Sequence, residues 1–302
     1  MVTSAQRELE VVSQIVKALK DGTAPWRKSW SASGGLALRE NGVPYQGMNQ
    51  VILGMLNDKP NPMWLTYNKA AELSGQRKEK GRWVTGEGKG VRPGPGTGEW
   101  ISFMGSGKSK KEGEEGKPFK FLKWYCVFNC SDIEGLPDRY YPQPVERESS
   151  NEVIPHVDAY LDNLGADVRH GGDRAFYAPG PDFIQLPNPQ DFDNIVSYYG
   201  TALHEQAHRT GHKSRLDRSL DKGSFGDKVY ALEELCAEMS AAFACSHLGI
   251  ENTVREDHSS YIASWIKKLQ DDPKALRKAC TAASKVIAWM DDQQPQEQKI
   301  AA

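Results

Sequence analysis

Two histidines four residues apart constrain this chain more than any other feature of its sequence. The segment that contains them reads Tyr-Tyr-Gly-Thr-Ala-Leu-His-Glu-Gln-Ala-His, in which His204, Glu205 and His208 form the pattern His-Glu-x-x-His. Residues four apart in a helix lie on one face, one turn above the other, so both imidazoles can reach a single cation. Glu205 would lie beside that cation, where it can take a proton from a water that the metal activates. The motif therefore predicts a metal centre on a helix, with Glu205 as general base.

A third ligand is needed, because a catalytic zinc site has three protein ligands and one open position. The downstream segment YALEELCAEMSAAFACSHL has the apolar spacing of a core helix, yet it contains Glu233, Glu234 and Glu238. A buried carboxylate needs a partner, and a cation is one. We expect Glu234 to be the third ligand and Glu238 to bond a ligand histidine. The alternatives are Glu233, Glu238 or His212, the last only if the helix continues through Gly211. The expected cation is Zn²⁺, and Mn²⁺ also suits these ligands.

Charge and tryptophan are divided unevenly along the chain. Residues 1–130 contain 20 Lys+Arg and 12 Asp+Glu, a net charge of +8, whereas the remainder contains 18 and 28, a net charge of −10. Six of the eight tryptophans also precede residue 130. One undivided domain would not be expected to separate charge in this way. We therefore expect a first domain at 1–135, a proline-containing linker at 136–150 and a second domain at 151–302.

Hydrophobic periodicity predicts an α+β fold, with a basic α+β first domain and a mostly helical second domain that has a small sheet. In the first domain we expect helices at 6–20, 48–57 and 68–74, strands at 63–66 and 119–130, a hairpin at 81–103 and a mobile loop at 104–118. In the second we expect helices at 153–164, 190–212, 228–248, 257–270 and 273–292, and short strands within 174–187. One of these strands, Phe183–Leu186, is expected to offer its edge to an extended peptide.

The basic half has the two ingredients of a single-strand binder, positive charge and aromatic side chains. Segment 69–123 contains thirteen lysines and arginines, and no zinc finger, helix-turn-helix or RNP-type motif accompanies them. We therefore expect single-stranded DNA as a partner, without sequence recognition of duplexes. The candidate contacts are Lys78, Arg82, Trp83, Lys89, Arg92, Lys108, Lys110 and Lys111.

Other composition features concern the compartment. The five cysteines are few and odd in number, which is typical of a reducing environment. No apolar run approaches the roughly 18 residues of a membrane span, and residues 1–20 lack the apolar block of a secretory signal. We expect a cytoplasmic protein without a membrane partner.

Six stretches of the chain resemble the antirestriction ArdC family of plasmid proteins, whose N-terminal part is similar to that of TraC-type conjugative primases. They are PWRKSW (25–30), YQGMN (45–49), WLTYNKAAELSGQ (64–76), AFYAPGPDFIQLP (175–187), YYGTALHEQAHRTGHKSRLDR (198–218) and FGDKVYALEELCAEMSAAF (225–243). The combination of the last two is highly specific, and the resemblance covers most of residues 10–250.

The resemblance implies a single-stranded-DNA-binding N-terminal domain and a zincin-like metallopeptidase C-terminal domain, which together protect incoming conjugative DNA from host restriction. A protein of the host restriction pathway would then be the peptidase substrate. Two other functions fit the same residues. One is a cytosolic metallopeptidase whose basic half recruits an acidic protein, and the other is a binding protein whose metal site is vestigial.

Overall fold

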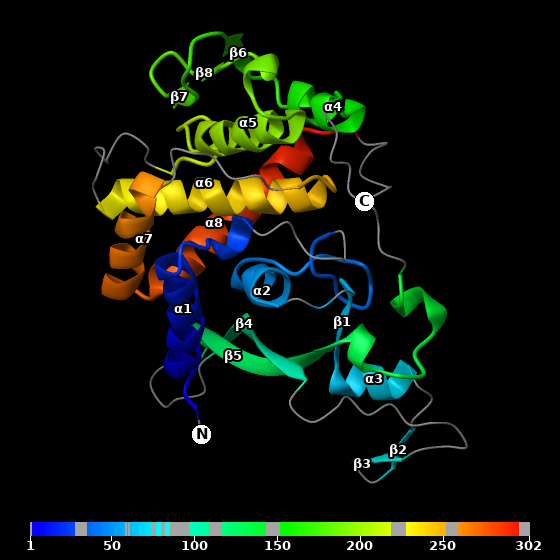
Figure 1. Cartoon of the computed structure of the whole chain (residues 1–302). Coiled ribbons are helices and arrows are strands. Elements are labelled where there is room, and N and C mark those ends of the chain that lie inside the picture. Colours follow the sequence, from blue (N-terminus) through cyan, green and yellow to red (C-terminus); the bar gives the residue numbers. More distant parts are fainter. Residues whose placement is uncertain are drawn as a thin grey trace.

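The structure is a computed structural model in which helices and small sheets form two parts (Figure 1). The N-terminal part extends from α1 to β5 and the C-terminal part from α4 to α8, which confirms the predicted two-domain α+β class. Residues 2–27, 35–57, 59, 61–73, 77–79, 82–84, 97–108, 116–142, 152–218, 228–251 and 259–295 are described. No helix among them is long and apolar enough to cross a bilayer.

The N-terminal part is built on an antiparallel sheet of order β1-β5-β4, against which α1 packs. The helix α1 begins with a capping box between Thr3 and Gln6 and buries one face, whereas Leu9 is exposed. The elements are α1 (Ser4–Lys20), η1 (Pro25–Arg27), α2 (Met48–Gln50), η2 (Val51–Met55), β1 (Trp64–Thr66), α3 (Tyr67–Leu73), β2 (Arg77–Glu79), β3 (Arg82–Val84), β4 (Gly98–Lys108), β5 (Pro118–Asn129), η3 (Cys130–Asp132) and η4 (Asp138–Tyr140).

The predicted hairpin at 81–103 is wrong. The strand β3 pairs with β2, whereas β4 pairs along its whole length with β5, which confirms the strand expected at 119–130. The loop expected at 104–118 is also wrong at both ends, since 104–108 belong to β4 and β5 begins at Pro118. Residues 109–115 of that prediction lie outside the described part of the chain.

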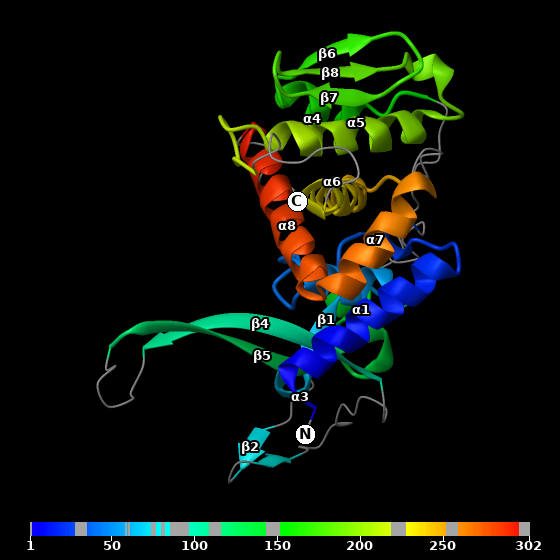
Figure 2. The ribbon, with the colours of Figure 1, turned by 90° about the vertical axis from the view of Figure 1, so that its left-hand side faces the viewer.

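The C-terminal part has a three-stranded sheet of order β6-β8-β7 that covers one side of α5 (Figure 2). Because β8 is the central strand and is paired on both sides, the expectation that it offers a free edge to a peptide is wrong. The predicted helices are all present. The elements are α4 (Pro155–Asn163), β6 (Asp167–His170), β7 (Phe176–Ala178), β8 (Phe183–Leu186), η5 (Pro189–Asp191), α5 (Ile195–Thr210), α6 (Lys228–His247), α7 (Ser259–Asp271) and α8 (Lys274–Asp292).

The two parts share one hydrophobic core. A single cluster of buried side chains includes residues of α1 and β5 together with residues of α5, α6 and α8. At its centre the rings of Trp26 and Trp265 meet edge to face with centroids 5.6 Å apart. The Arg277 guanidinium donates to the Glu8 carboxylate at 2.8 Å across the same boundary. Helices α7 and α8 of the C-terminal part reach the N-terminal part, where α7 contacts α1 and α8 contacts α2 (Figure 2), so each part completes the core of the other.

The segment that follows β5 packs on the N-terminal part. Ile133, Leu136 and Tyr140 are buried together with residues of β1 and α3. Two of them fall in the predicted linker 136–150, of which residues 143–150 lie outside the described part of the chain. The domain boundaries therefore stay a prediction.

Candidate metal centre

The helix α5 carries the His-Glu-x-x-His motif through the interior of the C-terminal part. It begins where the side chain of Asn194 accepts a hydrogen bond from the Ser197 amide at 2.8 Å, and it is buried along most of its length between the sheet and α6. His204 and Glu205 are each 3% exposed. A buried helix presents polar side chains only where they have partners, so the motif must meet charged groups on the neighbouring helix.

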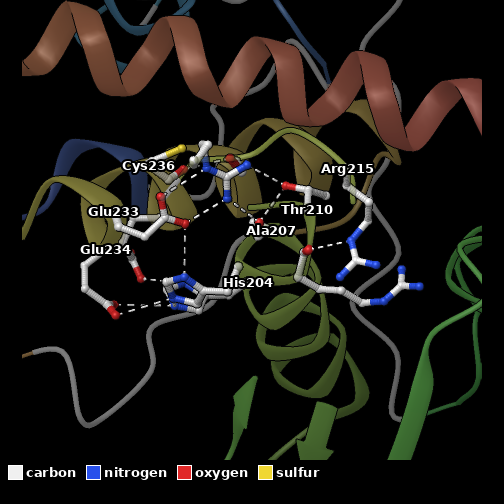
Figure 3. A network of polar contacts seen from close by, with 12 residues as sticks. His204, Ala207, Thr210, Arg215, Glu233, Glu234 and Cys236 are labelled. Atoms are coloured by element: carbon white, nitrogen blue, oxygen red, sulfur yellow. Dashed lines mark hydrogen bonds and ion pairs between the residues drawn. The ribbon is translucent and has the colours of Figure 1, made fainter. Parts of the chain in front are cut away.

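Glu234 of α6 meets the two histidines (Figure 3). The Nε2 atoms of His204 and His208 lie 3.1 Å apart, and the Glu234 carboxylate lies 3.7 Å from the first and 3.4 Å from the second. Metal bonds of about 2.0–2.2 Å in a tetrahedral site place the ligand atoms about 3.3 Å from one another. The first distance is to Oε2 and the second to Oε1, so the two nitrogens and the Glu234 carboxylate together fit one divalent cation, with a position left open.

Two further carboxylates lie against the far sides of the histidine rings. Glu238 Oε1 lies 3.2 Å from Nδ1 of His204, and Glu233 Oε1 lies 3.3 Å from Nδ1 of His208. A carboxylate on Nδ1 fixes the ring orientation and leaves the lone pair of Nε2 for a metal. The structure thus places Glu238 beside His204 and Glu233 beside His208, and the role of Glu238 stays a prediction.

Arg218 is a site residue that the sequence analysis missed. Its guanidinium donates to both oxygens of Glu233, at 2.8 and 3.0 Å, and also to Thr210 Oγ1 at 2.7 Å and the Ala207 carbonyl at 2.6 Å. Arg218 therefore ties the end of α5 to the carboxylate that orients His208. Its position ten residues after the motif carries no helical periodicity that could have revealed the contact.

The cluster is strongly negative when it holds no cation. Burial by itself would lower the pKa of His208, yet the negative charge of Glu234 and the hydrogen bond to Glu233 raise that pKa well above its ordinary value. Burial would likewise raise the pKa of Glu234, but the two imidazoles outweigh burial and hold it far below its usual range. The carboxylates thus require nearby positive charge, which a divalent cation can supply once the imidazoles are deprotonated.

Glu205 and His212 differ in their relation to this cluster. Glu205 lies next to His204 on α5, and its charge contributes to the raised pKa of His208. His212 follows the end of the helix at Thr210, and its Nδ1 lies 2.7 Å from the Ser214 hydroxyl. The helix does not continue through Gly211, so the structure does not bring His212 to the other two histidines.

The predicted DNA contacts are placed only in part. Lys108 is exposed at the end of β4. Lys78, Arg82 and Trp83 belong to the β2–β3 ribbon, for which the backbone pairing alone is described. The remaining candidates, Lys89, Arg92, Lys110 and Lys111, lie outside the described residues. These contacts stay predictions.

Two protein families match the chain, one in each part. The N-terminal domain of anti-restriction factor ArdC matches residues 5–128, and the zincin-like metallopeptidase family matches residues 155–283. The second match contains all three donors of the candidate metal centre.

Other relatives match nearly the whole length of this chain. The chain is 36% identical to the DNA primase TraC of Escherichia coli over 96% of its own length but only 28% of the primase. It is 31% identical to the uncharacterized protein y4eC of Sinorhizobium fredii, covering 96% of this chain and 92% of that one. Two crystal structures of the antirestriction ArdC protein from plasmid R388 superpose on 95% of the chain and 97% of their own length. The metal-free form has a TM-score of 0.77 at 32% identity, and the Mn(II)-bound form has 0.73 at 31%.

Proposed function

Because this chain belongs to the antirestriction ArdC family, we propose that it protects incoming conjugative plasmid DNA, binding it as single strands through the N-terminal part and acting on a protein through a metal-dependent peptidase site. The observation that carries the proposal is the convergence of His204, His208 and Glu234 on one point. The similarity to an Mn(II)-bound ArdC structure supports a divalent cation there, and Zn²⁺ is the cation that we propose, with Mn²⁺ as the alternative.

Each residue of the centre has a role in this proposal. A bound divalent cation would polarise a carbonyl and make a water more acidic. His204, His208 and Glu234 hold the cation, while Glu233 and Glu238 keep the two rings in place through Nδ1. Glu205 accepts the proton of the attacking water and then donates it to the leaving amine.

The Glu205→Gln variant tests the peptidase. The substitution keeps the size of the side chain and removes its ability to accept a proton, so we expect unchanged metal content. Hydrolysis by the site should fall about 10²- to 10⁴-fold, and protection of a plasmid entering a restricting host should fall with it. The measurements are elemental analysis and conjugative transfer frequency. Full protection by a metal-loaded Glu205→Gln protein would favour the binding-only function instead.

The DNA-binding half of the proposal rests on the net charge of +8 in residues 1–130 and on the similarity to a DNA primase. We expect the whole chain to bind a single-stranded oligonucleotide with an affinity that falls steeply with salt, by about 0.7 log units per log unit of salt for each phosphate contacted. The shared core makes the whole chain the appropriate sample, because residues 1–140 alone would expose its buried surface.

Fluorescence-anisotropy titrations at several salt concentrations measure the affinity and its dependence on salt. Single- and double-stranded DNA are compared. Absent binding, or equal binding of the two forms, would overturn the assignment. In that case an acidic protein would be the partner of the basic half, as in the alternative of a cytosolic metallopeptidase.

A further inference from the structure

The hairpin of β4 and β5 extends beyond the body of the protein (Figure 2). At its base, Asn49 bonds both the amide and the carbonyl of Ser102, at 2.9 and 2.8 Å, and β1 pairs with the last residues of β5. Farther out, from residue 103 to 108 and from 118 to 123, the two strands are paired with each other, and no third strand among the described residues joins them. The edges of this outer ribbon therefore carry no further strand in the part of the chain that is described.

One face of the ribbon carries a row of three phenylalanines. In the antiparallel register Phe103 lies opposite Lys123, Gly105 opposite Phe121, and Gly107 opposite Phe119, and opposed residues share a face. The ring of Phe121 is 6.4 Å from that of Phe103 and 6.0 Å from that of Phe119, measured between centroids. The three rings thus form a continuous row, which we call the phenylalanine row.

Glycines hold the rings in place from the opposite strand. A Cβ atom at Gly105 would collide with the Phe121 ring, and one at Gly107 would come within 3.1 Å of the Phe119 ring. The rings therefore lie across backbone that has no side chain, a cross-strand arrangement that orders an aromatic ring without burying it. The row is ordered before any partner arrives, which lowers the entropic cost of binding.

The phenylalanine row contributes little to the fold. Phe103, Phe119 and Phe121 are 52%, 48% and 38% exposed, and none of them belongs to the hydrophobic clusters among the described residues. An exposed apolar patch with a polar rim is typical of an interaction site. Exposed Lys123 lies on the face of the rings, opposite Phe103, and exposed Lys117 directly precedes β5, whereas exposed Lys108 and Lys120 lie on the other face of the ribbon. The sequence 100–126 contains six lysines and three glutamates, and the glutamates lie in 109–115, outside the described residues.

We propose that the phenylalanine row is the base-stacking platform for single-stranded DNA, an inference that rests on the proposed function. Every base has an aromatic face that stacks on a ring without regard to sequence, and Lys123 on the same face, with the other lysines of the ribbon, neutralises the phosphates. A duplex keeps its bases stacked inside, so the row selects single strands. The platform adds Phe103, Phe119 and Phe121 to the basic residues expected from the sequence.

Substitutions of Phe119 and Phe121 in the whole chain test the platform, with oligodeoxythymidylate as the probe. Alanine at either position should weaken binding by about 5- to 150-fold, as expected for loss of one stacked base. Phe119→Tyr should retain the affinity, whereas Phe119→Leu, which keeps apolar surface but has no aromatic face, should weaken it nearly as much as alanine. A probe that contains 2-aminopurine should lose fluorescence on binding, through stacking, in the unsubstituted protein and in Phe119→Tyr only.

The control is Phe176→Leu, which changes an equally exposed phenylalanine of the C-terminal part and should leave affinity unchanged. Thermal melting of each variant establishes that it is folded. Wild-type affinity in Phe119→Leu or in the alanine variants would overturn the platform while leaving DNA binding intact, and absent binding by the unsubstituted protein would overturn the proposed function itself. Binding to vesicles of phosphatidylcholine and phosphatidylserine is measured in parallel. If the phenylalanine substitutions weaken binding to vesicles but not to the oligonucleotide, the row contacts a membrane surface and is not a platform for bases.

Discussion

Replacing Glu234 with glutamine should remove the divalent cation from the purified protein, reducing it from an expected stoichiometry of about one ion per chain to a trace. Glutamine keeps the length and shape of the side chain but removes the negative charge that both imidazoles face at 3.4 and 3.7 Å. The two histidines alone cannot complete a three-ligand site. Elemental analysis of protein purified without added chelator measures the stoichiometry, and titration with Zn²⁺ and Mn²⁺ measures the loss of affinity.

Variants of the histidines at positions 208 and 212 provide the matched comparison. His208→Ala should lose the cation as Glu234→Gln does, whereas His212→Ala should retain it, because the ring of His212 is bonded to Ser214 beyond the end of α5. Glu238→Gln should retain the cation with an affinity about 10- to 100-fold weaker, since it loses only the bond to Nδ1 of His204. Unchanged stoichiometry in Glu234→Gln would remove Glu234 from the ligand set.

Helical periodicity in the sequence was enough to predict one part of this cluster, the two histidines. His204 and His208 are four apart, so their shared face follows from the pitch of a helix alone. Glu234 could be predicted from a second argument, that a carboxylate on an apolar helix needs a partner. Arg218 could not be predicted, because its contact with Glu233 depends on how the segment after α5 folds back.

The low apolar content of residues 104–118 accounts for the main error in the N-terminal part, because it suggested a loop. Gly105 and Gly107 belong to this stretch, and glycine weakens an isolated strand. In the structure both positions are in β4 and lie under the rings of Phe121 and Phe119 on β5. These glycines fit a strand because rings of the partner strand cover them. That pairing cannot be recognised before the register is known.

The division of charge along the sequence suggested two separate domains, whereas the two halves share one hydrophobic core. The net charges of +8 and −10 count charged residues along the sequence, whereas the contact between the halves is made by buried apolar residues such as Trp26 and Trp265. Two surfaces of opposite charge are compatible with one continuous core. The consequence is that the stability of the metal-binding half should depend on residues of the basic half.

The Trp26→Ala variant tests this dependence. Trp26 belongs to the N-terminal part and is 0% exposed, with its ring against that of Trp265. Truncation of a buried tryptophan costs about 3–5 kcal/mol, a large share of the roughly 5–15 kcal/mol that keeps a typical domain folded. If the core is shared, the loss lowers the free energy of unfolding of the whole chain, and the C-terminal part releases its cation at a lower denaturant concentration. Far-UV circular dichroism and metal release, followed in guanidinium, should shift together.

The matched control is Trp100→Ala, in the same part of the chain. Trp100 is 43% exposed, and its ring packs under the Arg7 guanidinium at 3.7 Å. An exposed cation–π pair contributes about 0.5–1 kcal/mol, so this variant should shift both transitions only slightly. Two separate transitions, of which Trp26→Ala moves the first and leaves metal release unchanged, would contradict a shared core. A single transition that moves as a whole would mean that the halves, although opposite in charge, fold as one cooperative unit, because the side chains that join them are apolar and buried.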